Sequence, residues 1–298
     1  MKTIRPIVLG MSLALAGASL ASAQDAATPS LPKIMQITRE WIKPGKSGQL
    51  HDKSESAFVA AMAKAKFPAH YVALNSMSGK SRAIYLTPYD SFAAWEKDNK
   101  AGDANAVLSA ELEHASVSDG DLLDSLDQAV LTSVEEMSFH PRADLSKARY
   151  LEISTYRVKP GHGSEWREIL KIVKDTYAKT GTSFHWGMFE LLYGGDGDTY
   201  LVLSSKESMT EIDARFEDEK KFGAILGEDG MKNFEALIAS AIDSASHQLF
   251  AVNPRQSYVD EAWIKADPNF WKPKKAAPDA AAAKPPKPAA APAKPASR

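Results

Sequence analysis

Two histidines stand at matching positions of a sequence that resembles itself, and each is followed by an aromatic residue. They are His70, before Tyr71, and His185, before Trp186, about 115 residues apart. An imidazole can ligate a metal or haem iron, or move protons near neutral pH. It can also serve only as a hydrogen-bonding group where a strand begins. The sequence favours this structural role. Haem ligation, metal ligation and another polar role in a binding pocket are the alternatives.

The motifs that usually mark catalytic or metal-binding chemistry are missing from the sequence. There is no cysteine, which excludes zinc-finger, iron–sulfur and thiol chemistry. Gly-Lys-Ser occurs at 45–47 and 79–81, but Glu40 and Leu74 stand where a phosphate-binding loop needs an earlier glycine. No serine-hydrolase or zincin motif occurs, and no two of the seven histidines have metal-chelating spacing on one element. We therefore predict no metal site, and the catalytic residues, if there are any, stay unknown.

The elements that position these residues follow one pattern that occurs twice. Residues 37–45 and 153–161 are both β-rich runs that end in Lys-Pro-Gly, a turn signal. An apolar stripe with helical spacing follows each run, over 50–65 and 166–177. Each stripe leads to a pair of strands around a glycine-containing turn, so that a strand, a helix and a hairpin are predicted in each copy.

Both copies are predicted to continue with helices and to close on a strand. The longer helices are expected around 122–130 and 234–242, and the closing strands at 137–142 and 250–255. The order β-α-β-β-α-β is that of the ferredoxin-like unit. An antiparallel sheet covered by helices on one face needs a cover on the other, and the sister copy supplies it. The predicted fold class is therefore α+β, with two tandem ferredoxin-like repeats that form a barrel within one chain.

Strand alternation indicates which side chains face the barrel interior. If the strand residues Ile42 and Val158 pack on helices, Trp41 and Arg157 face inward. Arg157 and Glu190 are predicted to be buried charges that pair with each other. The interior is expected to be mostly apolar with a few polar groups, which suits a small hydrophobic or aromatic ligand. The alternative is a barrel filled completely by its own side chains.

A family resemblance rests on the opening strand of the second copy. The segment 150–161, Tyr-Leu-Glu-Ile-Ser-Thr-Tyr-Arg-Val-Lys-Pro-Gly, resembles that of NIPSNAP-like members of the dimeric α/β-barrel superfamily. The resemblance covers roughly 33–257, through element order and the two Lys-Pro-Gly turns. The first copy matches less well, with Gln36 and Glu40 in place of Glu152 and Tyr156. The superfamily includes small-molecule monooxygenases and haem enzymes, so the resemblance implies a fold without fixing a function.

Both ends of the chain differ in composition from its body. Residues 1–23 have the form of a secretory signal peptide, with a basic start, a short apolar stretch and an Ala-Ser-Ala cleavage site. Residues 272–298 are almost entirely Ala, Pro and Lys and carry a net charge of +6, so they are expected to stay extended and solvated. The body between them is acidic. We expect an exported protein, periplasmic or secreted, without a transmembrane segment after signal cleavage.

The sequence thus predicts six segments. They are a signal peptide (1–23), a linker (24–32), repeat one (33–146), repeat two (147–258), a C-terminal extension (259–271) and a disordered Ala/Pro/Lys-rich tail (272–298).

The predicted function is binding of a small apolar or aromatic molecule between the repeats, without an obligate cofactor. The candidate ligand-binding residues are Trp41, His70, Tyr71, Arg157, His185, Trp186 and Glu190. The alternatives are a monooxygenase- or haem-type enzyme, and an envelope module whose cationic tail contacts anionic envelope components. Nucleic acid is not an expected partner because the body is acidic. The sequence leaves open whether any reaction is catalysed.

Overall fold

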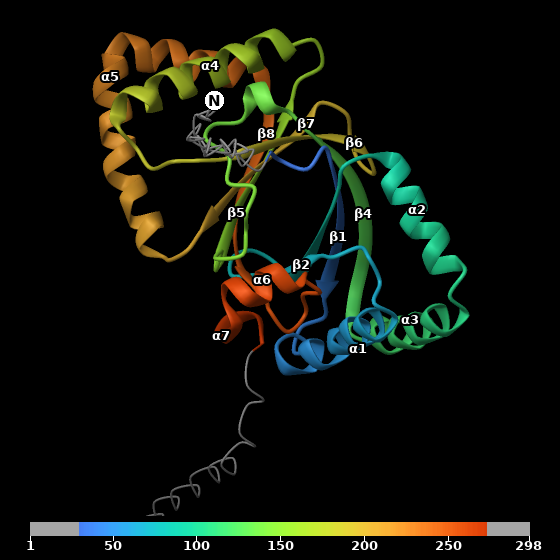
Figure 1. The fold of residues 1–298 in the computed structure, drawn as a ribbon. Coiled ribbons are helices and arrows are strands. Elements are labelled where there is room, and N and C mark those ends of the chain that lie inside the picture. Colours follow the sequence, from blue (N-terminus) through green and yellow to red (C-terminus); the bar gives the residue numbers. More distant parts are fainter. Residues whose placement is uncertain (1–29, 273–298) are drawn as a thin grey trace, which may run out of the picture.

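The computed structural model describes residues 30–272, which form a β-barrel with helices on its outside (Figure 1). The predicted signal peptide and nearly all of the tail lie outside these residues. In the part of the chain from 30 to 272, no helix is long and apolar enough to cross a membrane.

The element order is β-α-β-β-α-β in each half, with one additional helix in the first. The first half contains β1 (Ile34–Ile42), α1 (Gln49–Ala65), β2 (Val72–Ser76), β3 (Arg82–Tyr89), α2 (Phe92–Asp103), α3 (Ala106–Gly120), β4 (Leu123–Ser133) and the 3-10 turn η1 (Glu135–Met137). The second contains β5 (Tyr150–Val158), α4 (Gly163–Thr180), β6 (Gly187–Tyr193), β7 (Thr199–Lys206), α5 (Thr210–Ala241) and β8 (Ile242–Val252). Two short helices follow, α6 (Glu261–Ala266) and α7 (Pro268–Trp271). That the two halves are repeats of one sequence unit stays a prediction.

The eight strands close into one antiparallel barrel in the order β1-β3-β2-β8-β5-β7-β6-β4. Each half contributes a four-stranded sheet, and the two sheets join where β2 pairs with β8 and where β4 pairs with β6. Closure leaves none of these eight strands with an unpaired edge. The barrel predicted within one chain is therefore observed, with α1–α3 and the pair α4–α5 on different sides of it (Figure 1).

Apolar side chains from all eight strands fill the barrel. On β1, Met35 and Ile37 belong to this core, whereas Ile42 packs toward the helix side, as the alternation predicted. The other core members from the strands are Val72, Leu74, Ile84, Leu86, Ala129, Leu131, Leu151, Ile153, Phe189, Leu201, Phe250 and Val252. Their burial is the main apolar contribution that holds the two halves together.

Two predicted elements in the first half are wrong. The helix expected over 122–130 is strand β4, and the strand expected at 137–142 is the turn η1 followed by a single bridge from Phe139 to Trp186. Apolar residues three and four apart also suit a strand covered on both faces. Ala129 and Leu131 face the barrel core, whereas Val130 between them packs in a separate outer cluster. In the second half the helix extends to Ala241 as expected, but the last strand is 242–252 rather than 250–255.

The segment after β8 covers one end of the barrel. Trp271 is buried there, and its indole nitrogen donates a hydrogen bond to the backbone oxygen of Ser146 at 2.7 Å. Arg149 pairs with Asp267 and lies over the ring of Phe270. These contacts fix α6 and α7 against the loop that joins the two halves.

Candidate functional site

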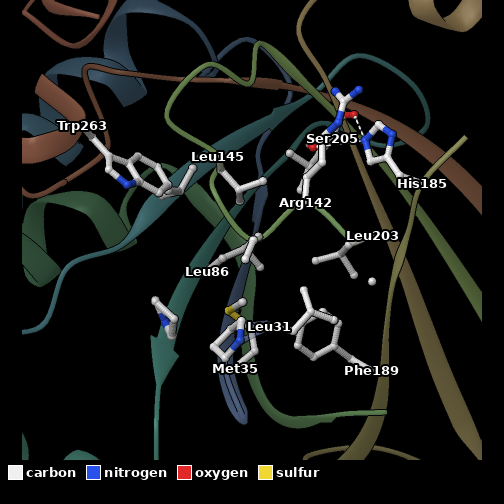
Figure 2. A pocket seen from close by; sticks show the side chains of 16 residues that line it. Leu31, Met35, Leu86, Arg142, Leu145, His185, Phe189, Leu203, Ser205 and Trp263 are labelled. Atoms are coloured by element: carbon white, nitrogen blue, oxygen red, sulfur yellow. Dashed lines mark hydrogen bonds between the residues drawn. The ribbon is translucent and has the colours of Figure 1, made fainter. Parts of the chain in front are cut away.

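The barrel interior contains a small cavity, of about 100 Å³, near its covered end. Both halves line it, as the positions of Leu31, Met35, Leu86, Phe189 and Leu203 show (Figure 2). Drug-sized ligands need roughly 300–1,000 Å³. The space between the halves is therefore mostly occupied by the protein's own side chains.

His185 borders this cavity, and its ring is held by backbone oxygens. Its Nε2 lies 2.6 Å from the Ser205 oxygen and its Nδ1 lies 3.2 Å from the Ser183 oxygen. Burial lowers the pKa of His185, which favours the neutral ring. A neutral imidazole donates through one nitrogen only, and the shorter contact identifies Nε2 as the donor. These contacts match the structural role.

The two histidines considered for haem do not fit that group. Both ring nitrogens of His185 face backbone oxygens, beside a cavity far smaller than a macrocycle. His70 stacks on Tyr258, with ring centroids 4.7 Å apart, and does not line the barrel cavity.

The aromatic residues that follow these histidines lie on the helix side of the sheets. Trp186 is buried, stacks on Phe139 and donates from its indole nitrogen to the Met137 oxygen at 3.0 Å. Tyr71 packs against Tyr85, with ring centroids 5.8 Å apart. His185 borders the barrel cavity, which Trp186 does not line, although both residues border a polar cavity on the helix side. His70 and Tyr71 both lie near Tyr258, with ring centroids 4.7 and 6.3 Å away.

The remaining three candidates do not gather into one site. Trp41 lies beneath the Arg82 guanidinium, 5.7 Å from its ring centroid. Arg157 is half exposed and pairs with Asp196 at 2.7 Å and Asp243 at 3.3 Å. The predicted buried pair of Arg157 and Glu190 is therefore wrong. The Arg157 guanidinium instead pairs with the exposed carboxylates of Asp196, after β6, and Asp243, at the start of β8.

An apolar cavity of the second half lies between its sheet and its helices. This aromatic chamber has a volume of about 350 Å³. Its aromatic walls are Tyr156, Trp166, Tyr177, Phe184, Trp186, Phe222 and Phe234, completed by aliphatic side chains of α4, α5 and β7. Helix α5 bends at Gly227, whose φ of 68° and ψ of 176° are non-helical. The bend lets residues from both arms of α5 close the chamber, with the rings of Phe222 and Phe234 5.6 Å apart.

A smaller polar cavity of about 150 Å³ adjoins the chamber and shares Tyr156, Tyr177, Phe184 and Trp186 with it. Its polar groups include His247, whose Nδ1 lies 2.8 Å from the Ser154 hydroxyl.

The charges around this polar cavity are compensated. Arg215 pairs with Glu219 at 2.6 Å and Glu152 at 3.5 Å, and buried Lys206 lies 3.4 Å from Glu152. Two cations thus face two carboxylates. The arrangement suits a neutral ligand with an apolar body and one polar end.

A groove of about 640 Å³ lies on the helix side of the first half, and we call it the first-half groove. Its wall contains a cluster of buried titratable groups. The cluster consists of Glu40, His51, Glu55 and Asp119, which we call the Glu40–Asp119 cluster. The His51 Nε2 lies 3.1 Å from Glu40 Oε2, 3.7 Å from Asp119 Oδ1 and 4.0 Å from Glu55 Oε1. Burial, together with the charges of Glu40 and Asp119, raises the pKa of Glu55 to about 9.

The sequence motifs did not indicate this cluster, because it has a single histidine and its four members lie on three different elements. Two signals were present. His51 and Glu55 are four residues apart on a predicted helix and therefore share a face. Glu40 alternates with Trp41 and falls on the same strand face as Ile42, toward the helices. Nothing local places Asp119 beside them.

The comparisons with known proteins concern the fold. No protein-family model matches the chain, and no curated protein sequence does so either. An anthrone oxidase-like protein is similar in structure at 12% identity and a TM-score of 0.50, over 77% of this chain and 95% of that one. A candidate monooxygenase from Fusobacterium nucleatum aligns at 12% identity and a TM-score of 0.49, over 74% of this chain and 93% of that one.

A variant chlorite dismutase from Candidatus Nitrospira defluvii, in complex with cyanide, aligns at 7% identity and a TM-score of 0.45. That alignment covers 79% of this chain and 95% of the dismutase. Identities this low bear on architecture alone. With its closed eight-stranded barrel and outer helices, the chain has a fold similar to that of dimeric α/β-barrel proteins.

Proposed function

We propose that the chain is an exported protein that binds a small neutral molecule, apolar or aromatic with one polar end, in the aromatic chamber. The observation that carries the proposal is the contrast between the two kinds of cavity. The barrel interior holds about 100 Å³, whereas the chamber holds about 350 Å³ with aromatic walls and a charge-compensated polar side. The site therefore lies between sheet and helices of the second half rather than inside the barrel.

Filling the chamber tests the proposal. Ala245 lines it on β8, opposite Tyr156 of β5. We expect Ala245→Phe to weaken binding of Nile red, a neutral apolar dye, at least tenfold, which corresponds to about 1.4 kcal/mol. Leu126→Phe is the matched control, because Leu126 on β4 holds the equivalent position opposite Glu40 of β1. Dye titrations of both variants and the parent protein supply the measurement; equal affinities in all three would contradict the proposal.

Native mass spectrometry of the gently purified mature protein identifies an endogenous ligand. We expect an added mass below that of haem, lost on activation, and no Soret absorbance. The enzyme alternative, a monooxygenase- or haem-type reaction on this fold, instead predicts turnover of the bound molecule or a Soret band. Release of the molecule unchanged supports the binding function.

The localisation of the protein and the role of residues 272–298 are proposals that rest on the sequence. The signal-like segment 1–23 supports export to the periplasm or medium, and N-terminal sequencing of the exported protein is expected to begin at Gln24. The net charge of +6 on residues 272–298 supports attachment to anionic envelope components. A chain ending at Trp271 is expected to lose that attachment while keeping the chamber.

A further inference from the structure

We propose that the Glu40–Asp119 cluster binds one divalent transition-metal ion in the wall of the first-half groove. The four side chains come from three elements: Glu40 from β1, His51 and Glu55 from α1, and Asp119 from α3. The site lies in the first half of the chain, and it is independent of the aromatic chamber in the second half.

The spacing of the ligand atoms fits a metal coordination shell. One nitrogen or oxygen atom from each residue lies within 4.8 Å of the others. From the His51 Nε2 the carboxylate oxygens are 3.1, 3.7 and 4.0 Å away. Metal–ligand bonds of about 2.1 Å require neighbouring ligands about 3.0–3.4 Å apart in octahedral or tetrahedral sites. A small contraction around the ion brings all four side chains into range.

The cluster gathers three buried carboxyl groups around a single imidazole. The side chains of Glu40, Glu55 and Asp119 are 8%, 5% and 3% exposed, and His51 is 1% exposed. Within residues 30–272, no lysine or arginine forms an ion pair with any of the three carboxyl groups. Three buried carboxyl groups beside a single imidazole are costly without a further cation.

Unpartnered atoms point to a missing group at the same place. In the described part of the chain, Glu55 Oε1, Asp119 Oδ1 and the Tyr85 hydroxyl are buried without hydrogen-bond partners. Asp119 also lies in the last turn of α3, where the negative end of the helix dipole disfavours a carboxylate. A cation bound between these oxygens gives the Glu55 and Asp119 oxygens a partner. It also offsets the unfavourable interaction of the Asp119 carboxylate with the helix dipole.

The far side of His51 is already oriented by a second layer of contacts. Gln256 Nε2 donates to His51 Nδ1 at 3.1 Å and to Asp52 Oδ1 at 3.0 Å. Histidine ligands are commonly held in this way through their second nitrogen. Because the metal needs the lone pair of Nε2, the ring proton moves to Nδ1. Gln256 Oε1, which is buried without a partner among residues 30–272, accepts from Nδ1 when the amide turns, and the hydrogen bond from Gln256 Nε2 to Asp52 is given up.

The donor set indicates the class of ion. One imidazole and three carboxylates provide nitrogen and oxygen donors without sulfur. Imidazole favours first-row transition metals such as Mn²⁺, Fe²⁺ and Zn²⁺ over the oxygen-seeking Ca²⁺ and Mg²⁺. Glu40, Glu55 and Asp119 all line the open groove, which gives the ion a path from solvent.

Titration of untagged, chelator-treated protein tests the proposal. We expect calorimetry and native mass spectrometry to show one Mn²⁺ or Zn²⁺ per chain, and much weaker binding of Ca²⁺ and Mg²⁺. At about one hundred times Kd, the ion is expected to raise Tm by roughly 5–10 °C. Equal, weak responses to all four ions would show only non-specific binding to acidic surface groups and would overturn the proposal.

Glu55→Gln separates a metal site from a structural network. The Gln side chain has nearly the same shape as the Glu side chain and carries no charge, so the variant is expected to fold and to be at least as heat-stable as the parent without metal. We expect its Mn²⁺ affinity to fall at least about 100-fold. Glu113→Gln, at an exposed position of α3, is the control and is expected to bind as the parent does. Unchanged affinity in Glu55→Gln would contradict the assignment.

Pulsed EPR supplies a readout specific to the histidine. The Mn²⁺-loaded parent protein is expected to show hyperfine coupling to a directly bound imidazole nitrogen. His51→Gln is expected to lose this coupling, whereas His114→Gln, exposed on α3, keeps it. Nitrogen coupling that survives in His51→Gln would place the ion elsewhere.

Discussion

At the scale of single residues, burial gives two histidines different roles. His185 lies among backbone oxygens, which hold its ring in place, and burial lowers its pKa. His51 lies among carboxyl groups that a single imidazole does not compensate. The same side chain is therefore a structural hydrogen-bonding group in one half and a candidate metal ligand in the other.

His185 is expected to make stability depend on pH. Its pKa in the folded protein lies below the ordinary value of 6.5, so the unfolded chain binds the proton first as pH falls. Stability gained from the neutral ring is thus present above about pH 6.5 and lost on acidification below it. Denaturant unfolding at pH 5 and 7.5 is expected to show a smaller difference in His185→Gln than in the parent. His114→Gln is the exposed control, and an undiminished difference in His185→Gln would refute the assignment.

At the scale of elements, the bend in α5 decides whether the second half has a chamber. A straight helix of 32 residues would extend about 48 Å and could not wrap both arms over one sheet. Gly227 allows the bend because its φ of 68° with ψ near 180° is a region that essentially only glycine adopts. Phe222 and Phe234, on either side of the bend, then meet over the cavity.

Gly227→Ala is expected to lower the free energy of unfolding by about 1–3 kcal/mol, because a Cβ strains this backbone conformation. Gly223→Ala is the matched control: it lies in the same helix with ordinary φ and open space around its Cβ. There the substitution is expected to stabilise by about 0.5–1 kcal/mol. Denaturant titrations of both variants test the contrast. If Gly227→Ala left the free energy of unfolding unchanged, the bend would tolerate a side chain and the prediction would be wrong.

At the scale of the whole molecule, barrel closure makes the two halves depend on one another. The seams, where the two sheets join, are short: β2 pairs with β8 through 74–76 and 250–252, and Leu74 and Phe250 within this pairing are fully buried. The common core, more than the hydrogen bonds of the seams, is therefore expected to hold the halves together.

Phe250→Ala is expected to destabilise the protein by about 3–5 kcal/mol and to leave a single unfolding transition. Phe216→Ala, 61% exposed on α5, is expected to have almost no effect. Thermal unfolding followed by tryptophan fluorescence and far-UV circular dichroism provides the test. Two separated transitions would mean that the halves unfold independently.

The sequence determined the features that depend on neighbours along the chain. Strand β1 ends before the Lys-Pro-Gly turn at 43–45, helix α4 follows its apolar stripe, and both hairpins form around glycine turns, because these signals lie within a few residues. The fold class and the one-chain barrel followed from that order. The same local signals were ambiguous for β4, because Leu123, Leu126 and Val130 have helical spacing and the buried residues 129–131 do not alternate with exposed ones.

Tertiary structure alone decided which side chains meet. The Glu40–Asp119 cluster joins residues separated by up to 79 positions, and the aromatic chamber depends on a bend whose direction no local pattern specifies. Arg157 took its partners from Asp196 and Asp243 instead of Glu190, because strand register and turn geometry brought them nearer. Side-chain proximity across elements is set by packing of the whole barrel, and that information is not contained in any short stretch of the chain.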